Sequence, residues 1–109
     1  MDCVFCKILD GSIPSKRVWE DEKFILINDV APQAKVHYLA IPKFHKALLS
    51  ECTKDQLDVI KHIICVVTDH QNEWGLCGGY RIMINQGSDG NQTVPHLHIH
   101  FLGGEKLKG

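Results

Sequence analysis

Three of the seven histidines of this chain lie close together in Pro95-His96-Leu97-His98-Ile99-His100-Phe101-Leu102. Histidines and apolar residues alternate strictly, which is the period of a β-strand, where successive side chains point to opposite faces. A helix would distribute the same histidines around its circumference. The pattern therefore predicts a strand with three imidazoles on one face and three apolar side chains on the other.

Three imidazoles on one strand face support two chemical hypotheses. Histidine is a common zinc ligand, so the three rings can form a metal site. Imidazole is also a nucleophile and a proton carrier near neutral pH, which suits catalysis at an acyl or phosphoryl centre. The preceding residues 86–93 are rich in glycine and hydrogen-bond donors, and loops of this kind bind phosphate. The composition therefore favours nucleophilic catalysis over a metal cage, and both over three merely exposed histidines.

Outside this stretch, the expected elements are short, with the exception of one helix. Apolar runs and turn residues predict a short helix over 4–9 and strands over 18–20, 24–28, 37–41 and 80–85. A capping box at Thr53 and Gln56 begins a long helix that runs to about Asn72. We expect a single α+β domain over residues 1–109, with an antiparallel sheet of about five strands per subunit.

The long helix is expected to take part in a subunit interface. Its apolar stripe is wide and comprises Leu57, Ile60, Ile63, Ile64, Val66 and Val67. One small sheet cannot cover a stripe of this width, so we expect a symmetric homodimer.

The bulk composition excludes several classes of function. The net charge of -1, from 12 basic and 13 acidic residues, gives no basic surface for nucleic acid. No apolar run is long enough to span a membrane, so no membrane partner is expected. Five cysteines without a recognisable secretion signal favour reduced thiols and a cytoplasmic location.

Residues 90–102 resemble the signature of the histidine-triad (HIT) nucleotide-binding family, His-x-His-x-His followed by two apolar residues. Residues 28–34 and 37–45 match other stretches of that family, so the resemblance extends from about Cys3 to Gly104. Gly103-Gly104 resembles the Hint branch, which splits phosphorus–nitrogen bonds in nucleoside phosphoramidates. The branch that splits dinucleoside polyphosphates usually carries Pro-Arg at these two positions.

The resemblance implies a role for each residue of the catalytic motif. His98 would attack the α-phosphorus and form a covalent nucleotidyl-histidine, which water then hydrolyses. His100 would donate a hydrogen bond to the phosphate, and His96 would hold His98 through the local network. Thr93, where the Hint branch commonly carries Ser, would donate toward the leaving group.

The resemblance also implies a nucleotide site. Asp29 would accept hydrogen bonds from both ribose hydroxyls, although without the resemblance an Asp before Ala-Pro would be read as a turn former. Asn85 would contact the phosphate, and Gln92 is expected among the nucleotide-binding residues. The apolar base pocket would comprise Phe5, Ile8, Ile27, Asn28 and Val30. Asn28 departs from the family, where His is common.

Cys3 and Cys6 form a Cys-x-x-Cys pair with three possible functions: a redox couple, two free thiols, or half of a structural zinc site. No βαβ context supports the redox couple. Many bacterial members of the family bind zinc through such a pair together with two histidines, which would be His45 and His96 here. This zinc would be structural, because the cleavage requires no cofactor.

We therefore expect a purine nucleoside phosphoramidase that acts on AMP or GMP amidates. The alternatives are a dinucleoside polyphosphate hydrolase, a metal-dependent hydrolase built on the triad, and a nucleotide-binding regulatory module with vestigial hydrolysis. His37, at the start of a strand, is expected only to be a buried hydrogen-bonding residue.

Overall fold

The structure, a computed structural model, describes residues 3–109, so the first two residues of the expected domain lie outside the described part. Five strands form one antiparallel sheet in the order β1-β2-β3-β5-β4, which confirms the expected α+β class. The elements are α1 (Val4–Leu9), β1 (Arg17–Glu20), β2 (Phe24–Asn28), β3 (Val36–Pro42), the 3-10 helix η1 (Leu49–Glu51), α2 (Lys54–Asp69), β4 (Tyr80–Met83) and β5 (Ile99–Gly103).

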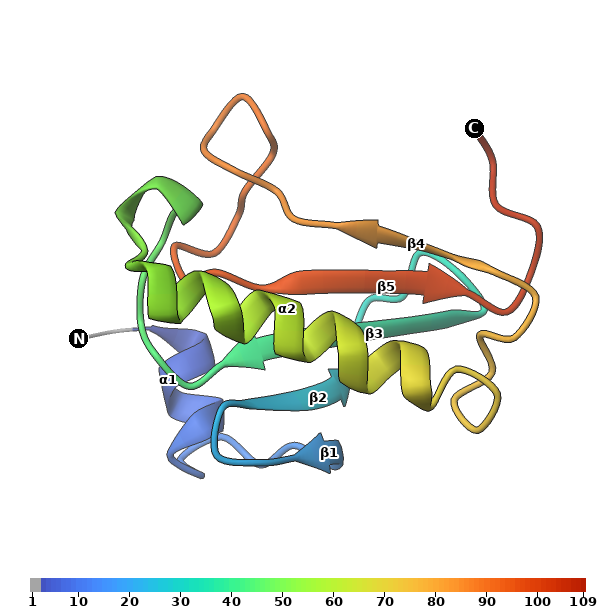
Figure 1. Cartoon of the computed structure of the whole chain (residues 1–109), viewed down its shortest axis with the longest axis horizontal. Coiled ribbons are helices and arrows are strands. Elements are labelled where there is room, and N and C mark those ends of the chain that lie inside the picture. Colours follow the sequence, from blue (N-terminus) through green and yellow to red (C-terminus); the bar gives the residue numbers. More distant parts are fainter. Residues whose placement is uncertain (1–2) are drawn as a thin grey trace.

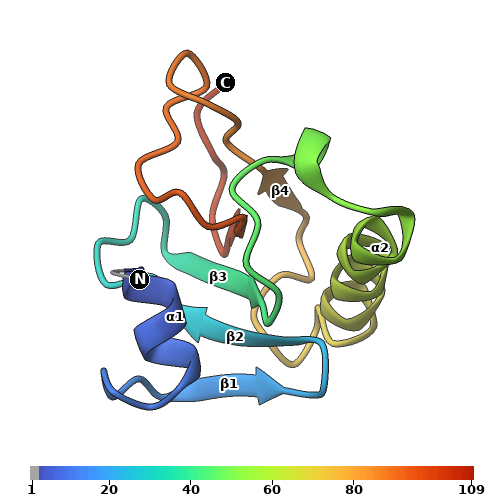
Figure 2. The same cartoon turned by 90° about the vertical axis from the view of Figure 1, so that its left-hand side faces the viewer.

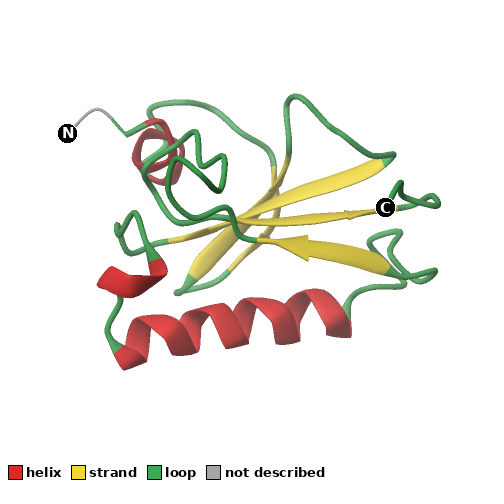
Figure 3. Ribbon diagram, turned by 90° about the horizontal axis from the view of Figure 1, so that it is seen from above, coloured by secondary structure: helices red, strands yellow, loops and turns green. Residues whose placement is uncertain are grey.

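The two α-helices cover opposite faces of the sheet (Figures 1, 2 and 3). Strand β2 shows why, because all of its first four side chains are buried and they alternate between two apolar clusters. Phe24 and Leu26 pack on the α2 side, whereas Ile25 and Ile27 pack on the α1 side. Strand β2 is therefore buried on both faces, which its almost continuous apolar sequence permits.

The histidine strand is shorter than predicted. Strand β5 begins only at Ile99, so His96 and His98 precede it. Pairing of β5 with β3 ends at Ala40 opposite Ile99, and continuing the ladder would place Pro42 opposite Leu97. Pro42 has no N–H to donate, and the amide of Leu97 instead donates to the carbonyl of Lys46 at 2.7 Å. The alternation nevertheless persists, because Leu97, Ile99 and Phe101 are all fully buried in the α2-side cluster.

Helix α2 and strand β4 end earlier than predicted, whereas β1 begins one residue earlier and β3 is one residue longer at each end. Helix α2 ends at Asp69 rather than Asn72, because the backbone leaves the helical conformation at the cap residue His70, with φ of -107°, and a series of turns follows up to residue 75. Strand β4 ends at Met83 rather than Asn85, and the loop of residues 84–92 follows directly. Within residues 3–109, no helix is long and apolar enough to cross a membrane.

Asp21, in the turn before β2, ties the sheet to α2 and gives a pH-dependent contribution to stability. Burial raises the pKa of this carboxyl, but hydrogen bonds from His62, Trp19 and the amides of Lys23 and Phe24 outweigh that effect and lower the pKa to about 2. A depressed folded-state pKa stabilises the protein above the unfolded-state pKa of about 4, and the contribution disappears as the pH falls through about 2.

We therefore expect Asp21→Asn to lower the free energy of unfolding by about 1 kcal/mol at pH 7, because the side chain is partly exposed. Urea denaturation at several pH values checks this. The difference in free energy of unfolding between the variant and the wild type should decrease as the pH falls from about 4 to about 2. A constant difference over that interval would contradict the assignment.

Candidate functional site

The three histidines lie on the α1 side of the sheet. The rings of His98 and His100 are neighbours, with centroids 5.1 Å apart, and Phe5 of α1 packs edge-on to His98 at 5.0 Å. His98 and His96 are buried, whereas His100 is partly exposed. The predicted shared face is therefore present, although only its last histidine belongs to a hydrogen-bonded strand.

Hydrogen bonding leaves one nitrogen of His98 available for chemistry. Its Nδ1 lies 2.7 Å from the carbonyl oxygen of His96, so Nδ1 carries a proton and donates. A neutral ring then has a lone pair on Nε2. Among the described residues, no buried side-chain nitrogen or oxygen lacks a partner. Because Nε2 of His98 has no protein partner there, it must reach solvent.

His96 contacts His98 through its backbone rather than through its imidazole ring. The carbonyl of His96 accepts from His98, while its imidazole points away into a cluster with Cys3, Cys6 and His45. Burial lowers the pKa of His96. The ring of His96 is therefore neutral, and the group that fixes the ring of His98 is the backbone carbonyl.

A fourth histidine and a carboxylate complete the histidine face. His37 of β3 lies with Nε2 2.9 Å from Nδ1 of His100 and 3.3 Å from Oδ2 of Asp29. Burial, together with the neighbouring His98 and His37, lowers the pKa of His100 to about 4. Burial also lowers the pKa of His37, against the opposing effect of Asp29. Both rings are therefore neutral at physiological pH.

Asp29 makes the turn contact expected of it and also lies beside the histidine face. Its Oδ1 accepts the backbone N–H of Ala31 at 2.8 Å, which is the turn-forming contact. Its Oδ2 faces His37, so the carboxylate lies beside the histidine face. The side chain of Asp29 is 15% exposed and can still accept a hydrogen bond from a ligand.

The other predicted nucleotide residues surround this face unequally. Phe5, Ile8 and Ile27 belong to the α1-side apolar cluster. Asn28 is exposed and Val30 is completely exposed, so neither is part of that cluster. A base could contact these two residues only from the solvent side.

The loop that precedes the histidines is organised by its own side chains. Gln92 donates to the carbonyls of Ala47 and Val94 and accepts from the amide of Gly87, so its amide group is already in use. Asn85 donates to the carbonyl of Gly90 at 2.8 Å. Thr93 is exposed. These contacts give Gln92 and Asn85 a structural function in the loop, whereas Thr93 is accessible to a ligand.

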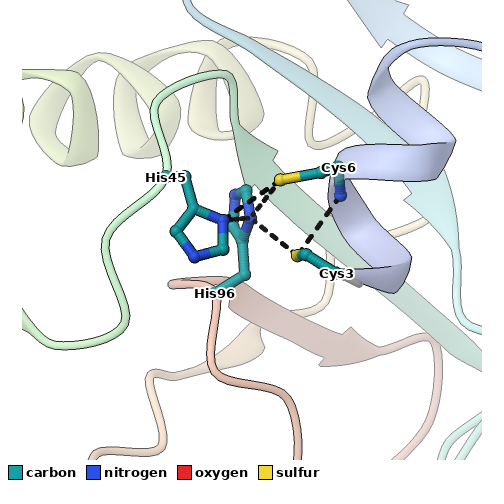
Figure 4. A group of neighbouring side chains, drawn as sticks. All are labelled: Cys3, Cys6, His45 and His96. Atoms are coloured by element: carbon teal, nitrogen blue, oxygen red, sulfur yellow. Dashed lines mark hydrogen bonds between the residues drawn. The ribbon is translucent and has the colours of Figure 1, made fainter. Parts of the chain in front are cut away.

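Cys3, Cys6, His45 and His96 meet at one end of the sheet, as Figure 4 shows. Cys3 caps α1 and Cys6 lies in that helix, while His45 follows β3 and His96 precedes β5. Sγ of Cys6 lies 3.1 Å from Nδ1 of His45 and 3.6 Å from Nδ1 of His96. Sγ of Cys3 lies 3.3 Å from Nδ1 of His96. The four residues named from the sequence are therefore brought together.

The cluster fits zinc by three criteria. Two thiols and two imidazoles are a common donor set for structural zinc, and ligand atoms in such a tetrahedron are about 3.3–3.8 Å apart, close to the observed separations. Nε2 of His96 lies 3.0 Å from the carbonyl of Pro42, which directs the lone pair of Nδ1 toward the sulfurs. Burial and the neighbouring Cys3 raise the pKa of Cys6, which a bound cation would reverse.

A hollow of about 620 Å³ lies away from the histidines. It is lined by residues 75, 77–81 and 104–107 and includes none of the predicted site residues. Arg81 donates to the carbonyl of Lys108 at 2.6 Å, which fixes the C-terminal segment along this hollow. We assign it no catalytic function.

His37 is the residue of this site that sequence reasoning did not assign. His37, Leu39 and Ile41 alternate along β3, and Leu39 and Ile41 pack on the α1 side. The same alternation therefore indicated the face of His37. Without the pairing of β3 with β5, however, nothing in the sequence placed it beside His100.

The fold and the site together define an α+β protein. Three histidines lie just before and within the interior strand β5, and a fourth histidine and a carboxylate lie beside them. The family model described as "Scavenger mRNA decapping enzyme C-term binding" matches residues 2–108. A histidine triad protein structure from Clostridium difficile is 43% identical, has a TM-score of 0.93, and covers 100% of this chain and 96% of its own. A HIT-like protein of Synechococcus elongatus is 45% identical over 97% of this chain and 93% of its own length. The chain belongs to the HIT family.

Two further relatives of known structure are a hydrolase and a zinc-bound protein. A HIT family hydrolase from Legionella pneumophila is 37% identical, with a TM-score of 0.91, over 98% of this chain and 96% of its own. A zinc-bound histidine triad family protein from Mycobacterium smegmatis is 36% identical, with a TM-score of 0.83, over 94% of this chain and 74% of its own.

Proposed function

We propose that this protein is a hydrolase that cleaves the phosphorus–nitrogen bond of purine nucleoside phosphoramidates through a nucleotidyl-histidine. One observation carries the proposal: Nδ1 of His98 donates to a carbonyl, while Nε2 has no partner within residues 3–109 and reaches solvent. A neutral imidazole held in this tautomer is prepared to attack phosphorus. The HIT family hydrolase from Legionella pneumophila supports a hydrolytic activity of this type.

The first step forms a bond between Nε2 of His98 and the phosphorus as the phosphorus–nitrogen bond breaks. The attacking ring gains positive charge, which strengthens its hydrogen bond from Nδ1 to the carbonyl of His96. The departing amine takes a proton, and Thr93, which is exposed, is the donor we assign to it. In the second step, water attacks the phosphorus and gives a proton back to Thr93, the bond to His98 breaks, and the nucleoside monophosphate leaves.

Comparing substrates tests the reaction class. We expect amine release from adenosine or guanosine phosphoramidate, and a value of kcat/KM for diadenosine polyphosphate at least about 10²-fold lower. The opposite order would favour the dinucleoside polyphosphate hydrolase. Tight nucleotide binding without turnover would favour the regulatory module, and loss of activity after complete chelation without unfolding would favour the metal-dependent hydrolase.

Asp29 provides a second test, because we assign it to the ribose hydroxyls. Asp29→Asn should raise KM by about tenfold and change kcat little, since a neutral amide accepts weaker hydrogen bonds than a carboxylate. A 2′-deoxynucleoside substrate checks the contact itself. The variant and the wild type should differ less with this substrate than with the ribonucleoside. Equal effects on both substrates would contradict the ribose assignment.

We assign a structural function to zinc at Cys3, Cys6, His45 and His96, supported by the donor set and by the zinc-bound relative. Bound there, zinc would link the start of α1 to the two segments that carry His45 and His96. Because all five cysteines are free, the site suits a reducing compartment such as the cytoplasm.

The homodimer is also part of the proposal. Leu57 on α2 and Ile82 on the edge strand β4 are 42% and 39% exposed, so each leaves apolar surface unburied in a single subunit. We expect sedimentation at micromolar concentration to give twice the mass of one chain. A monomer at that concentration would contradict the proposed homodimer.

A further inference from the structure

The backbone amide of Gln33 determines where His37 carries its proton. The nitrogen of this amide lies 3.0 Å from Nδ1 of His37. A backbone N–H can only donate, so Nδ1 of His37 must accept and cannot itself be protonated. The proton of His37 therefore lies on Nε2. The His37 side chain is only 1% exposed, so water does not compete for this contact.

The proton on Nε2 of His37 in turn determines the tautomer of His100. Nε2 of His37 lies 2.9 Å from Nδ1 of His100, so His37 donates and His100 accepts. The reverse direction would leave His37 with no proton on either nitrogen, which is an imidazolate and is excluded near neutral pH. Since a neutral imidazole has a single N–H, that of His100 must lie on Nε2.

Asp29 does not replace His100 as the acceptor of the proton on Nε2 of His37. Its Oδ2 is 3.3 Å from Nε2 of His37, farther than Nδ1 of His100, and its Oδ1 already accepts the amide of Ala31. Nε2 of His100 has no partner among the described residues and, like that of His98, must reach solvent. Two adjacent rings therefore present opposite groups to a ligand: a lone pair on His98 and a donor on His100.

We propose that His37 is a positioning residue, which transmits the direction of the Gln33 amide to His100 and so fixes His100 as a hydrogen-bond donor to the phosphoryl oxygen. In the other tautomer, His100 would present a lone pair to an anionic phosphate and would repel it. The catalytic consequence rests on the proposed function, whereas the tautomer itself does not.

Two matched pairs of variants test the relay in the full-length protein. Gln33→Pro removes the backbone N–H, whereas Gln33→Ala retains it, and both act at an exposed position. His37→Phe removes the donor to His100, whereas His37→Gln places an amide N–H near the position of Nε2. The Gln33 pair tests the relay even if His37→Phe does not fold.

The first readout is nitrogen-15 NMR of the histidine side chains, which distinguishes protonated from unprotonated ring nitrogens. We expect His100 to be protonated on Nε2 in the wild type, Gln33→Ala and His37→Gln. In Gln33→Pro and His37→Phe it should become a mixture of tautomers. A wild-type His100 protonated on Nδ1, or a single unchanged tautomer in all four variants, would overturn the relay.

The second readout is phosphoramidate turnover. His37→Phe should lower kcat by about 10- to 100-fold with KM changed less than about threefold, and His37→Gln should recover most of the loss. A loss that His37→Gln fails to recover would overturn the positioning function. If the wild type shows no turnover, the proposed function fails, while the NMR spectra still decide the relay.

Discussion

Replacing His98 with Asn is expected to abolish turnover of a nucleoside phosphoramidate, with a loss in kcat of at least about 10³-fold. Asn can occupy the space of the imidazole but offers no basic nitrogen to attack phosphorus. Nucleotide binding should remain within a few-fold of the wild type, because Asp29 and the apolar cluster are unchanged. Single-turnover assays and calorimetric titration with AMP measure the two properties separately.

His62→Asn is the matched control for this experiment. His62 lies on α2, on the opposite side of the sheet, where its ring contacts Asp21 at 2.7 Å. The same chemical change there should leave kcat unaltered, although stability decreases slightly. Turnover by His98→Asn above about a tenth of the wild-type rate would refute the nucleophile assignment, as would a covalent adduct trapped on another side chain.

Removing zinc from the cluster of two cysteines and two histidines is expected to have the largest effect on stability. A tetrahedral site contributes to folding because its ligands are gathered only in the folded state. Cys3→Ser or Cys6→Ser should therefore abolish stoichiometric zinc and lower Tm by about 10 °C or more. Elemental analysis and calorimetry provide the two measurements.

Cys65→Ser and Cys77→Ser are the matched controls, because both cysteines are exposed and lie outside the cluster. Each should retain one zinc per chain and the wild-type Tm. If the purified wild type holds no zinc, and chelation leaves Tm unchanged, the structural zinc site is wrong. Activity that survives chelation in still-folded protein would show that zinc is not needed for the chemistry.

The sequence was sufficient for the elements with strong local signals. The helix over 4–9 and the strand over 24–28 have the predicted bounds, because a mainly apolar run flanked by turn residues leaves few alternatives. The capping box at Thr53 is present, with Gln56 contacting the Thr53 amide at 2.9 Å. The ends of β4, β5 and α2 were wrong, since they depend on which backbone groups find partners in distant segments.

The order of residues is enough to place three imidazoles on one face, because side-chain direction in an extended chain follows from a period of two. It also identified, through the family resemblance, the four residues that meet in the zinc-binding cluster. Which nitrogen of each ring is available to a ligand follows instead from the folded backbone. Those assignments come from the carbonyls of His96 and Pro42 and from the amide of Gln33, which ordinary side-chain patterns do not reveal. A tautomer depends on which backbone group lies about 3 Å from each ring nitrogen, so it is a property of the folded backbone, even where that group is only two residues away, as for His98.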